Sequence, residues 1–358
     1  MAIRINGDDI IRDEILLKSL YNHSVLISGA SGFIGSHIIN TLLYLNRTYD
    51  AKITVIALVR DKNKAHKKFT DNLDDPHFHI HVQDVCESFT IEKDIDYIIH
   101  AASHASPRYY LKDPVGTIKP NVLGTINLLE MAKEKQISSF LYVSSGEIYG
   151  TFSDDTKSIA EPDSGYIDPL NVRSCYAESK RMGENICVSY LHQFGVPIKI
   201  VRPFHIYGPG MAMDDGRVQA DFVSNVVKGE DIVMKSDGKN YRTFCYIADA
   251  VRAFFTVLLK GKNGEAYNVG NDTAEIQIND LAKLLAHSVS REKIRVVRQA
   301  RKKEEHYRES PIERCRPSIE KIMKLGWKPR YSLEEGFRRT IESYYQDLEH
   351  IVAISKHS

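Results

Sequence analysis

The sequence has few cysteines, and none is spaced as a disulfide framework or a zinc site requires. Five cysteines occur among the 358 residues, at positions Cys86, Cys175, Cys187, Cys245 and Cys315. No two of them form a Cys-x-x-Cys pair. We therefore expect reduced thiols, a cytoplasmic location and no bound metal.

Long apolar runs and an excess of charge are also missing. No stretch approaches the ~18 apolar residues of a membrane-spanning helix, and the N-terminal stretch 1–22 lacks the apolar core of a signal peptide. With 48 basic and 47 acidic residues the net charge is +1, which argues against nucleic acid or an anionic membrane as partner. The 42% hydrophobic content is that of an ordinary globular protein with one large domain or two joined ones.

A glycine-rich turn stands between a short apolar run and a helical pattern. Val25-Leu26-Ile27 predicts a buried strand, and the pattern Gly29-x-x-Gly32-x-x-Gly35 follows it with Phe33 and Ile34 inside the turn. Apolar residues then recur at helical spacing. Strand, glycine turn and helix predict a dinucleotide site, because glycines let the backbone approach a pyrophosphate that rests on the helix N-terminus.

The end of the next predicted strand, 53–59, leaves the choice of cofactor open. An acid there would bind the ribose hydroxyls of NAD. Here Arg60 would hold the 2′-phosphate of NADP, whereas Asp61 would serve the ribose of NAD. Two further predicted strands, 77–82 and 97–99, lead to the remaining residues expected around the cofactor: Asp84, Val85, Ala101 and Ala102.

Tyr176 and Lys180 lie one helical turn apart and share a helix face. An ammonium held near a phenol favours the phenolate, so the pair predicts a tyrosine pKa below its usual ~10. Such a tyrosine takes a proton from a hydroxyl as hydride leaves the same carbon. The pair alone is common in helices without catalytic roles, so the interpretation depends on its neighbours, above all Ser145 and Glu147.

Strands and helices alternate over the first part of the chain. Predicted helices at 121–135 and 176–191 alternate with predicted strands at 140–143 and 198–201. This rhythm predicts an α/β fold with a doubly wound parallel sheet of the Rossmann type.

The alternation breaks after residue 202. We expect a dinucleotide-binding domain over 1–201 and a smaller, interleaved substrate-binding domain over most of 202–358. The chain is expected to return to the main sheet near 245–270.

Taken together, the glycine turn, Ser145 and the Tyr176/Lys180 pair resemble an extended short-chain dehydrogenase/reductase over roughly 24–348. Within that family the sequence is most similar to the UDP-glucuronate decarboxylases, or UDP-xylose synthases. The stretches that carry this likeness are His104–Pro107 with Tyr110 and Asp113-Pro114, Asp168-Pro169, Arg173–Tyr176 with Lys180-Arg181, Met213–Val218, Arg242–Tyr246, and 325–336.

The resemblance implies NAD as cofactor and a nucleotide sugar that is transiently oxidised at C4. Tyr176 would take the hydroxyl proton, Ser145 would orient the same oxygen, and Lys180 would hold the nicotinamide ribose. The C4 ketone then eases loss of carbon dioxide from C5, or loss of water if the sugar carries a hydroxyl at C6. Glu147 would act in either reaction, the decarboxylation or the dehydration, and the hydride would then return to the sugar.

The resemblance also implies a substrate site made by Tyr110, His205, Arg217 and Arg242 together with Ser145 and Glu147. Arg242 would clamp the diphosphate by paired hydrogen bonds, and Arg217 would lie near the nucleotide end. At His205 this chain departs from the family, which usually has asparagine there. A homodimer built on two helices per subunit, near 122–135 and 176–191, is expected as well.

Two features favour decarboxylation. Simple 4-epimerases of this kind lack an acid at the position of Glu147, and epimerases and dehydratases commonly have Arg-Asp where this chain has Arg242-Thr243. A 4,6-dehydratase and then a 4-epimerase remain as alternatives. A dinucleotide-binding regulatory subunit is the non-enzymatic alternative, although the Ser/Tyr/Lys set is intact.

Overall fold

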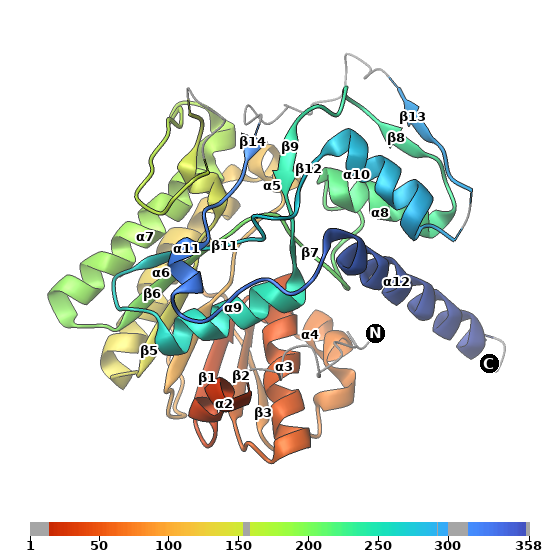
Figure 1. Cartoon of the computed structure of the whole chain (residues 1–358). Helices are drawn as coiled ribbons and strands as arrows, with labels where there is room; N and C mark the ends of the chain where they lie inside the picture. Colours follow the sequence, from red (N-terminus) through yellow and green to blue (C-terminus); the bar gives the residue numbers. More distant parts are fainter. Residues whose placement is uncertain (1–13, 153–157, 292, 300–313, 356–358) are drawn as a thin grey trace.

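The structure, a computed structural model, describes residues 14–152, 158–291, 293–299 and 314–355. Within them a seven-stranded parallel sheet has the order β11-β6-β5-β4-β1-β2-β3, with helices on both faces (Figure 1). The strand order reverses between β1 and β4, and open α/β sheets form their ligand crevice at such a point. The predicted doubly wound parallel sheet is therefore confirmed.

The elements of this layered body are close to those expected. Its strands are β1 (Ser24–Ser28), β2 (Thr54–Val59), β3 (Phe78–Val82), β4 (Tyr97–His100), β5 (Ser139–Val143), β6 (Ile198–Pro203) and β11 (Ala266–Val269). Its helices are α2 (Glu14–Leu17), α3 (Phe33–Tyr49), α4 (Lys62–Lys68), α5 (Pro107–Lys112), α6 (Pro114–Lys135), α7 (Cys175–Phe194), α9 (Ile247–Lys260) and α11 (Glu320–Met323).

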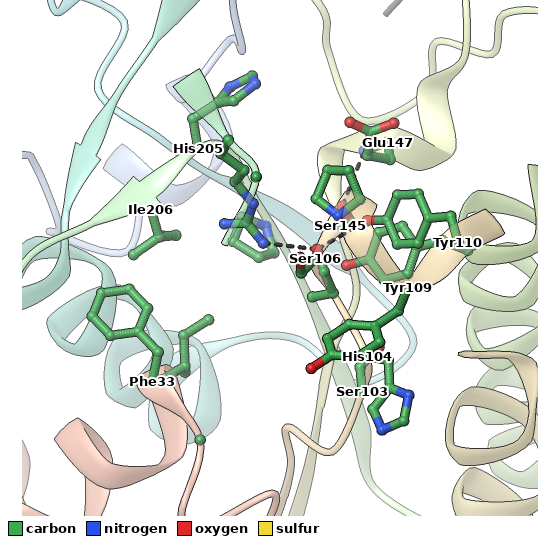
Figure 2. A pocket seen from close by; sticks show the side chains of 18 of the residues that line it. Phe33, Ser103, His104, Ser106, Tyr109, Tyr110, Ser145, Glu147, His205 and Ile206 are labelled. Carbon is green, nitrogen blue, oxygen red and sulfur yellow. Dashed lines mark hydrogen bonds between the residues drawn. The ribbon is translucent and has the colours of Figure 1, made fainter. Parts of the chain in front are cut away.

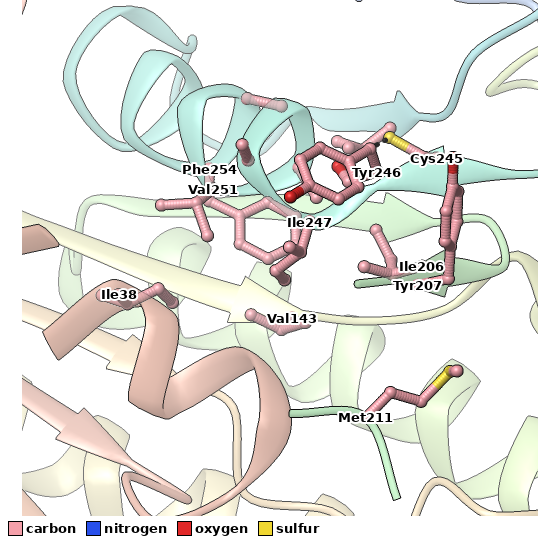
Figure 3. Close-up of a cluster of buried hydrophobic side chains, with 14 of the residues drawn as sticks. Ile38, Val143, Ile206, Tyr207, Met211, Cys245, Tyr246, Ile247, Val251 and Phe254 are labelled. Atoms are coloured by element: carbon pink, nitrogen blue, oxygen red, sulfur yellow. Dashed lines mark hydrogen bonds between the residues drawn. The ribbon is translucent and has the colours of Figure 1, made fainter. Parts of the chain in front are cut away.

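Strand residues alternate between the two faces of the sheet. Val25 and Ile27 belong to the buried cluster that includes α3 and α9, whereas Leu26 packs into the cluster that includes α6 and α7. Figure 3 shows Ile38 of α3 and Val143 of β5 within the first cluster. Because successive side chains on a strand point to opposite faces, continuous apolar strands of this kind need helices on both sides.

Helix α6 begins seven residues before the predicted helix at 121–135. The Asp113 side chain accepts a hydrogen bond from the Gly116 amide at 3.0 Å and caps the helix N-terminus, with Pro114 as the first helical residue. Gly116 and Pro120 interrupt the apolar pattern, which is why the sequence located only the second part of this helix.

Mostly short elements cover the carboxyl edge of the sheet (Figure 1). They comprise β7 (Ile206–Tyr207), α8 (Val218–Lys228), β8 (Ile232–Met234), β9 (Tyr241–Thr243), β10 (Cys245–Tyr246), β12 (Glu275–Gln277), α10 (Ile278–Leu284), β13 (Val296–Arg298) and β14 (Arg314–Cys315). The long helix α12 (Leu333–Ser355) follows them and packs against α8. The strands pair as β7 with β10, β8 with β13, and β9 between β12 and β14. Among the described helices none has both the length and the apolarity to cross a membrane.

Asp249 ties α9 to the segment that leads into α12. Its buried carboxylate pairs with Arg252 at 2.9 Å and accepts hydrogen bonds from the backbone amides of Arg330 and Tyr331. Its carbonyl accepts from the Trp327 indole at 3.0 Å. This carboxylate thus joins α9, which packs on the main sheet, to the segment that leads into α12.

We predict that Asp249→Ala lowers the free energy of unfolding by about 3–5 kcal/mol, because it leaves the buried Arg252 charge and two amides unpaired. Urea denaturation followed by circular dichroism measures the loss. Asp280→Ala is the matched control: Asp280 pairs with Lys283 at the same 2.9 Å and spacing, but both side chains are about half exposed. Equal effects of the two substitutions would contradict the role given to Asp249.

Candidate active site

A cavity of about 900 Å³ lies along the carboxyl edge of the sheet, between the strand ends and the covering elements. Its lining includes every residue predicted for the site: Gly29, Gly32, Phe33, Ile34, Gly35, Arg60, Asp84, Val85, Ala101, Ala102, Tyr110, Ser145, Glu147, Tyr176, Lys180, His205, Arg217 and Arg242. Figure 2 shows Ser145, Glu147 and Tyr110 on one wall, with His205, Ile206 and Phe33 across from them.

The glycine turn after β1 is packed too tightly for side chains. Gly29 has φ +66°, and a Cβ there would lie 2.7 Å from the Ala101 carbonyl oxygen. A Cβ on Gly35 would lie 2.4 Å from the Gly29 carbonyl oxygen. Gly32 forms the N-cap of α3, so the helix begins inside the turn. These residues fit a pyrophosphate that approaches the backbone and accepts hydrogen bonds from the helix N-terminus.

The end of β2 presents Arg60 rather than an acid. The Arg60 side chain is 57% exposed and lies 3.9 Å from Asp84, and it contacts His104 Nε2 at 3.0 Å. Asp61 accepts a hydrogen bond from the Lys64 amide at 2.9 Å and caps α4. Since the Asp61 carboxylate is engaged in that cap, Arg60 is the side chain best placed for the adenosine ribose.

The strand β5 runs directly into the predicted catalytic loop. Ser145 caps the short helix η3 (Gly146–Tyr149), and its hydroxyl accepts a hydrogen bond from the Glu147 amide at 3.1 Å. Lys180 of α7 donates to the carbonyl of Val143 at 2.6 Å. Burial lowers the pKa of Lys180 to about 7.

Tyr176 is buried against a second tyrosine. Its ring stacks on Tyr110 with centroids 4.9 Å apart and an interplanar angle of 12°. The Tyr110 hydroxyl donates to the Ala105 carbonyl at 2.9 Å, which holds that ring in place. The ring of Tyr110 therefore covers the ring of Tyr176, while the Tyr110 hydroxyl is bound to the backbone of the loop at Ala105.

The predicted lowering of the Tyr176 pKa is wrong. Burial raises that pKa above its usual value; the Ser145 hydrogen bond and the charge of Arg217 act against the rise, and Glu147 adds to it. Lys180 is not among the groups that shift this pKa; its ammonium donates to the Val143 carbonyl instead. The sequence showed that tyrosine and lysine share a helix face, but not how deeply both are buried.

Arg217 is held by two neighbours within the cavity, and its predicted place near the nucleotide end stays a prediction. It donates to the Ala105 carbonyl at 2.7 Å and lies 3.2 Å from Asp215, and its charge lowers the pKa of Tyr176. The loop that carries Ala105 lies against the Tyr110 ring, so Arg217 reaches the same end of the cavity.

His205 and Arg242 line the opposite wall. His205 follows β6 with φ 37°, a backbone conformation in which asparagine is more usual than histidine. Burial, followed by the charges of Arg242 and Arg217, lowers its pKa to about 3, so the ring is neutral. Arg242 of β9 donates to the Tyr241 carbonyl at 2.7 Å.

Sequence reasoning assigned no role to many lining residues, among them Arg173, Lys64 and Cys315. Arg173 lies in one of the family-like stretches. Lys64 lies on α4, four residues after Arg60, and Cys315 reaches the cavity from β14, far away in sequence. Among the described residues, no three His, Cys, Asp or Glu side chains come together as a metal site.

A comparison with known protein families shows to which family the chain belongs. Residues 25–270 match the model of the NAD dependent epimerase/dehydratase family. The chain belongs to this family. The family-level resemblance read from the motifs, and with it an enzymatic nucleotide-sugar-modifying class, is confirmed.

Several relatives within the family are decarboxylases. The chain is 35% identical to UDP-glucuronic acid decarboxylase 3 of Arabidopsis thaliana, over 88% of this chain and 87% of the relative. It is 33% identical to UDP-glucuronic acid decarboxylase 1 of Xenopus tropicalis, over 91% of this chain and 73% of the relative.

Solved structures of the family share the fold. A UDP-glucose 4-epimerase of Thermotoga maritima superposes with a TM-score of 0.77 at 24% identity, covering 91% of this chain and 99% of that one. A UDP-glucuronic acid 4-epimerase of Bacillus cereus, in complex with UDP-glucuronic acid and NAD, gives 0.75 at 23% identity and covers 90% and 99%.

The buried Lys180 predicts a pH-dependent stability. Its pKa is about 7 in the folded protein, against an ordinary lysine value of 10.5 in the unfolded chain, so between these values the unfolded chain binds more protons and stability rises with pH. Relative to Lys180→Met, the wild type should gain on the order of 2 kcal/mol between pH 7 and 9. Urea unfolding at several pH values measures the difference.

Lys62→Met removes an exposed lysine of α4 and serves as the control. It should leave the pH profile of stability parallel to that of the wild type. A Lys180→Met profile that is also parallel would show that the ammonium is not buried as described.

Proposed function

We propose that the protein is a decarboxylase that converts UDP-glucuronate to a UDP-pentose and carbon dioxide, with NAD recycled within each turnover. The observation that carries the proposal is the juxtaposition of Glu147 with Tyr176 and Ser145 in one cavity, in a chain 35% identical to UDP-glucuronic acid decarboxylases. A simple epimerase needs no acid at that place.

The first step is oxidation at C4 of the sugar. Tyr176 takes the proton of the C4 hydroxyl, and Ser145 donates a hydrogen bond to the same oxygen and fixes its direction. Lys180 lies one turn further along α7 and holds the nicotinamide ribose. A bound NAD supplies the carbon that accepts the hydride and a positive ring that favours the tyrosinate.

The second step takes place at C5, where Glu147 acts. When carbon dioxide leaves, the electron pair of the C5–C6 bond moves to the C4 carbonyl and forms an enolate. Glu147 has the role of transferring a proton to C5 of this enolate. The hydride then returns to C4. Electrons balance without an external oxidant.

The residues around the adenosine ribose determine whether the protein prefers NAD or NADP. NAD is the cofactor of the proposal, in keeping with the family, and Gly29, Gly32 and Gly35 with Asp84, Val85, Ala101 and Ala102 would hold it. Arg60 and Lys64 also suit a 2′-phosphate, so NAD and NADP are to be compared in the same assay.

The elements that cover the sheet form the part of the cavity assigned to the substrate. We propose that the part after residue 202, with His205, Arg217 and Arg242, binds the nucleotide diphosphate, while 1–201 binds the dinucleotide. All five cysteines are free, which supports a cytoplasmic location.

We predict that the purified protein forms a UDP-pentose and carbon dioxide from UDP-glucuronate, as measured by mass spectrometry. Tyr176→Phe should lower the rate on the order of 10³-fold because it removes the base. Glu147→Gln should lower pentose formation by about 10²-fold but still allow reduced cofactor to appear at 340 nm on mixing with substrate.

Other products would redirect the assignment. Loss of water from a nucleotide hexose would indicate a dehydratase, and interconversion at C4 would indicate an epimerase. Dinucleotide binding without turnover of any of these substrates, unaffected by Tyr176→Phe, would indicate a regulatory subunit.

A homodimer is proposed on the outer face of α6 and α7. The two helices pack against each other, and α6 exposes Val115, Ile118 and Leu123, while α7 exposes Met182. Exposed apolar side chains on two adjacent helices are of the kind found at a protein interface.

We predict that the double substitution Val115→Glu with Ile118→Glu shifts a dimer to monomer in sedimentation velocity experiments, because it places charge in the contact. Leu348→Glu introduces the same charge at an exposed leucine of α12 and should not change the oligomeric state. A monomeric wild-type protein at micromolar concentration would contradict the proposal.

A further inference from the structure

The turn that carries Glu147 is held by the sheet at one end only. The Ser144 amide donates to the Val201 carbonyl at 2.8 Å, so the pairing of β5 with β6 continues past the last residue of β5. Ser145 follows in an extended conformation, with φ −160° and ψ 151°. Glu147 itself belongs to the helix η3, which has left the sheet. Ser145 is therefore fixed by strand pairing, whereas η3 depends on other contacts.

The direction of the Glu147 side chain depends on the backbone of η3. The side chain is half-buried and lies on the wall of the cavity (Figure 2). Among the described residues, none donates a hydrogen bond to its carboxylate or forms an ion pair with it. Its amide donates to the Ser145 hydroxyl at 3.1 Å, at the start of η3. A carboxylate that no other side chain holds stays in place only if the backbone that carries it is fixed.

Two side chains outside the cavity lining hold η3, and the first is Arg181 of α7. Its Nε donates to the Ile148 carbonyl at 2.7 Å, and its Nη2 donates to the Gly165 carbonyl at 2.9 Å. The Gly165 amide donates in turn to the Tyr149 carbonyl at 2.8 Å. One guanidinium thus ties two consecutive residues of η3 to the helix that also carries the base.

The second is Tyr149, the last residue of η3, which is 1% exposed. Its hydroxyl accepts a hydrogen bond from Arg202 at 2.8 Å and donates one to the Asn268 side-chain oxygen at 2.6 Å. Arg202 in turn binds both carboxylate oxygens of Glu184 on α7, at 2.9 and 2.7 Å, and the Asn268 amide group donates to two backbone carbonyls. Because both partners are fixed themselves, the hydroxyl can be satisfied in only one position.

The groups of the first chemical step are held without η3. Lys180 donates to the Val143 carbonyl at 2.6 Å, and the Tyr176 ring stacks on Tyr110. Ser145 is fixed by the continued pairing of β5 with β6. Oxidation at C4 therefore uses groups whose positions do not depend on the contacts that hold η3.

We propose that Arg181 and Tyr149 are positioning residues for the second step: they hold Glu147 beside C5 of the sugar and take no part in the oxidation at C4; this inference rests on the proposed function. A misplacement of about 1 Å can slow a reaction on the order of 10²-fold, so a small movement of η3 is enough to separate the two steps. Glu147 transfers the proton to C5 before the hydride returns to C4. A displaced Glu147 therefore leaves the reduced cofactor and the oxidised sugar in the site for longer.

The test follows both steps in Tyr149→Phe and Arg181→Met. Tyr149→Phe removes one hydroxyl and keeps the ring, and Arg181→Met keeps the apolar part of the side chain. After mixing with UDP-glucuronate and NAD, each variant should form UDP-pentose about tenfold more slowly, while the rate at which reduced cofactor appears changes by less than about threefold. Stopped-flow absorbance at ~340 nm measures the oxidation, and mass spectrometry of quenched samples measures the pentose.

A double variant separates positioning from a general loss of structure. Because both positioning residues act through one carboxylate, adding Tyr149→Phe to Glu147→Gln should slow pentose formation no further than Glu147→Gln alone. Tyr345→Phe is the matched control: it removes a hydroxyl that donates to the Val226 carbonyl at 3.0 Å, on α12 and outside the cavity lining. This control should change neither rate.

Hydrogen exchange of the full-length protein gives a measurement that does not depend on the substrate. In both variants the amides of 146–149 should exchange about tenfold faster than in the wild type, and Tyr345→Phe should not change them. Equal losses in both rates, additive losses in the double variant or unchanged exchange would overturn the inference even if UDP-pentose forms. Faster exchange in both variants of a protein that forms no UDP-pentose would support the hold of these residues on η3 and remove the decarboxylase assignment instead.

Discussion

One buried hydrogen bond, from the ammonium of Lys180 to the carbonyl of Val143, joins the helix that carries the base to the strand that leads into Ser145. The distance between Tyr176 and the catalytic loop depends on it. Because parallel strands end at the same edge of a sheet, the glycine turn after β1 and the alanines after β4 face the same cavity. The Lys180–Val143 hydrogen bond thus positions the base, Tyr176, beside a cofactor site formed at the ends of other strands.

Much of this arrangement could be predicted from sequence, because strand ends carry local signals. The motifs alone predict the glycine turn after β1, Ser145 after β5 and the Tyr176/Lys180 pair on α7, and all of them line one cavity. The start of α6 was missed because a capping aspartate, not an apolar pattern, defines it. Helix periodicity contains no information about such a cap.

Properties that depend on distant parts of the chain could not be predicted. The direction of the Tyr176 pKa shift is set by burial under Tyr110, which comes from another segment. The contact of Arg217 with Ala105 joins segments far apart in the sequence, so it is apparent only in three dimensions.

The stack of Tyr110 on Tyr176 has a consequence for the lifetime of the intermediate. Tyr110 belongs to α5 and is tied by its hydroxyl to the loop at Ala105, so the position of this loop fixes the ring that covers the base. A shift of the loop would pull Tyr110 away from Tyr176 and admit water to the base. The lifetime of a reactive ketone in the site would therefore depend on a contact that takes no part in the chemistry.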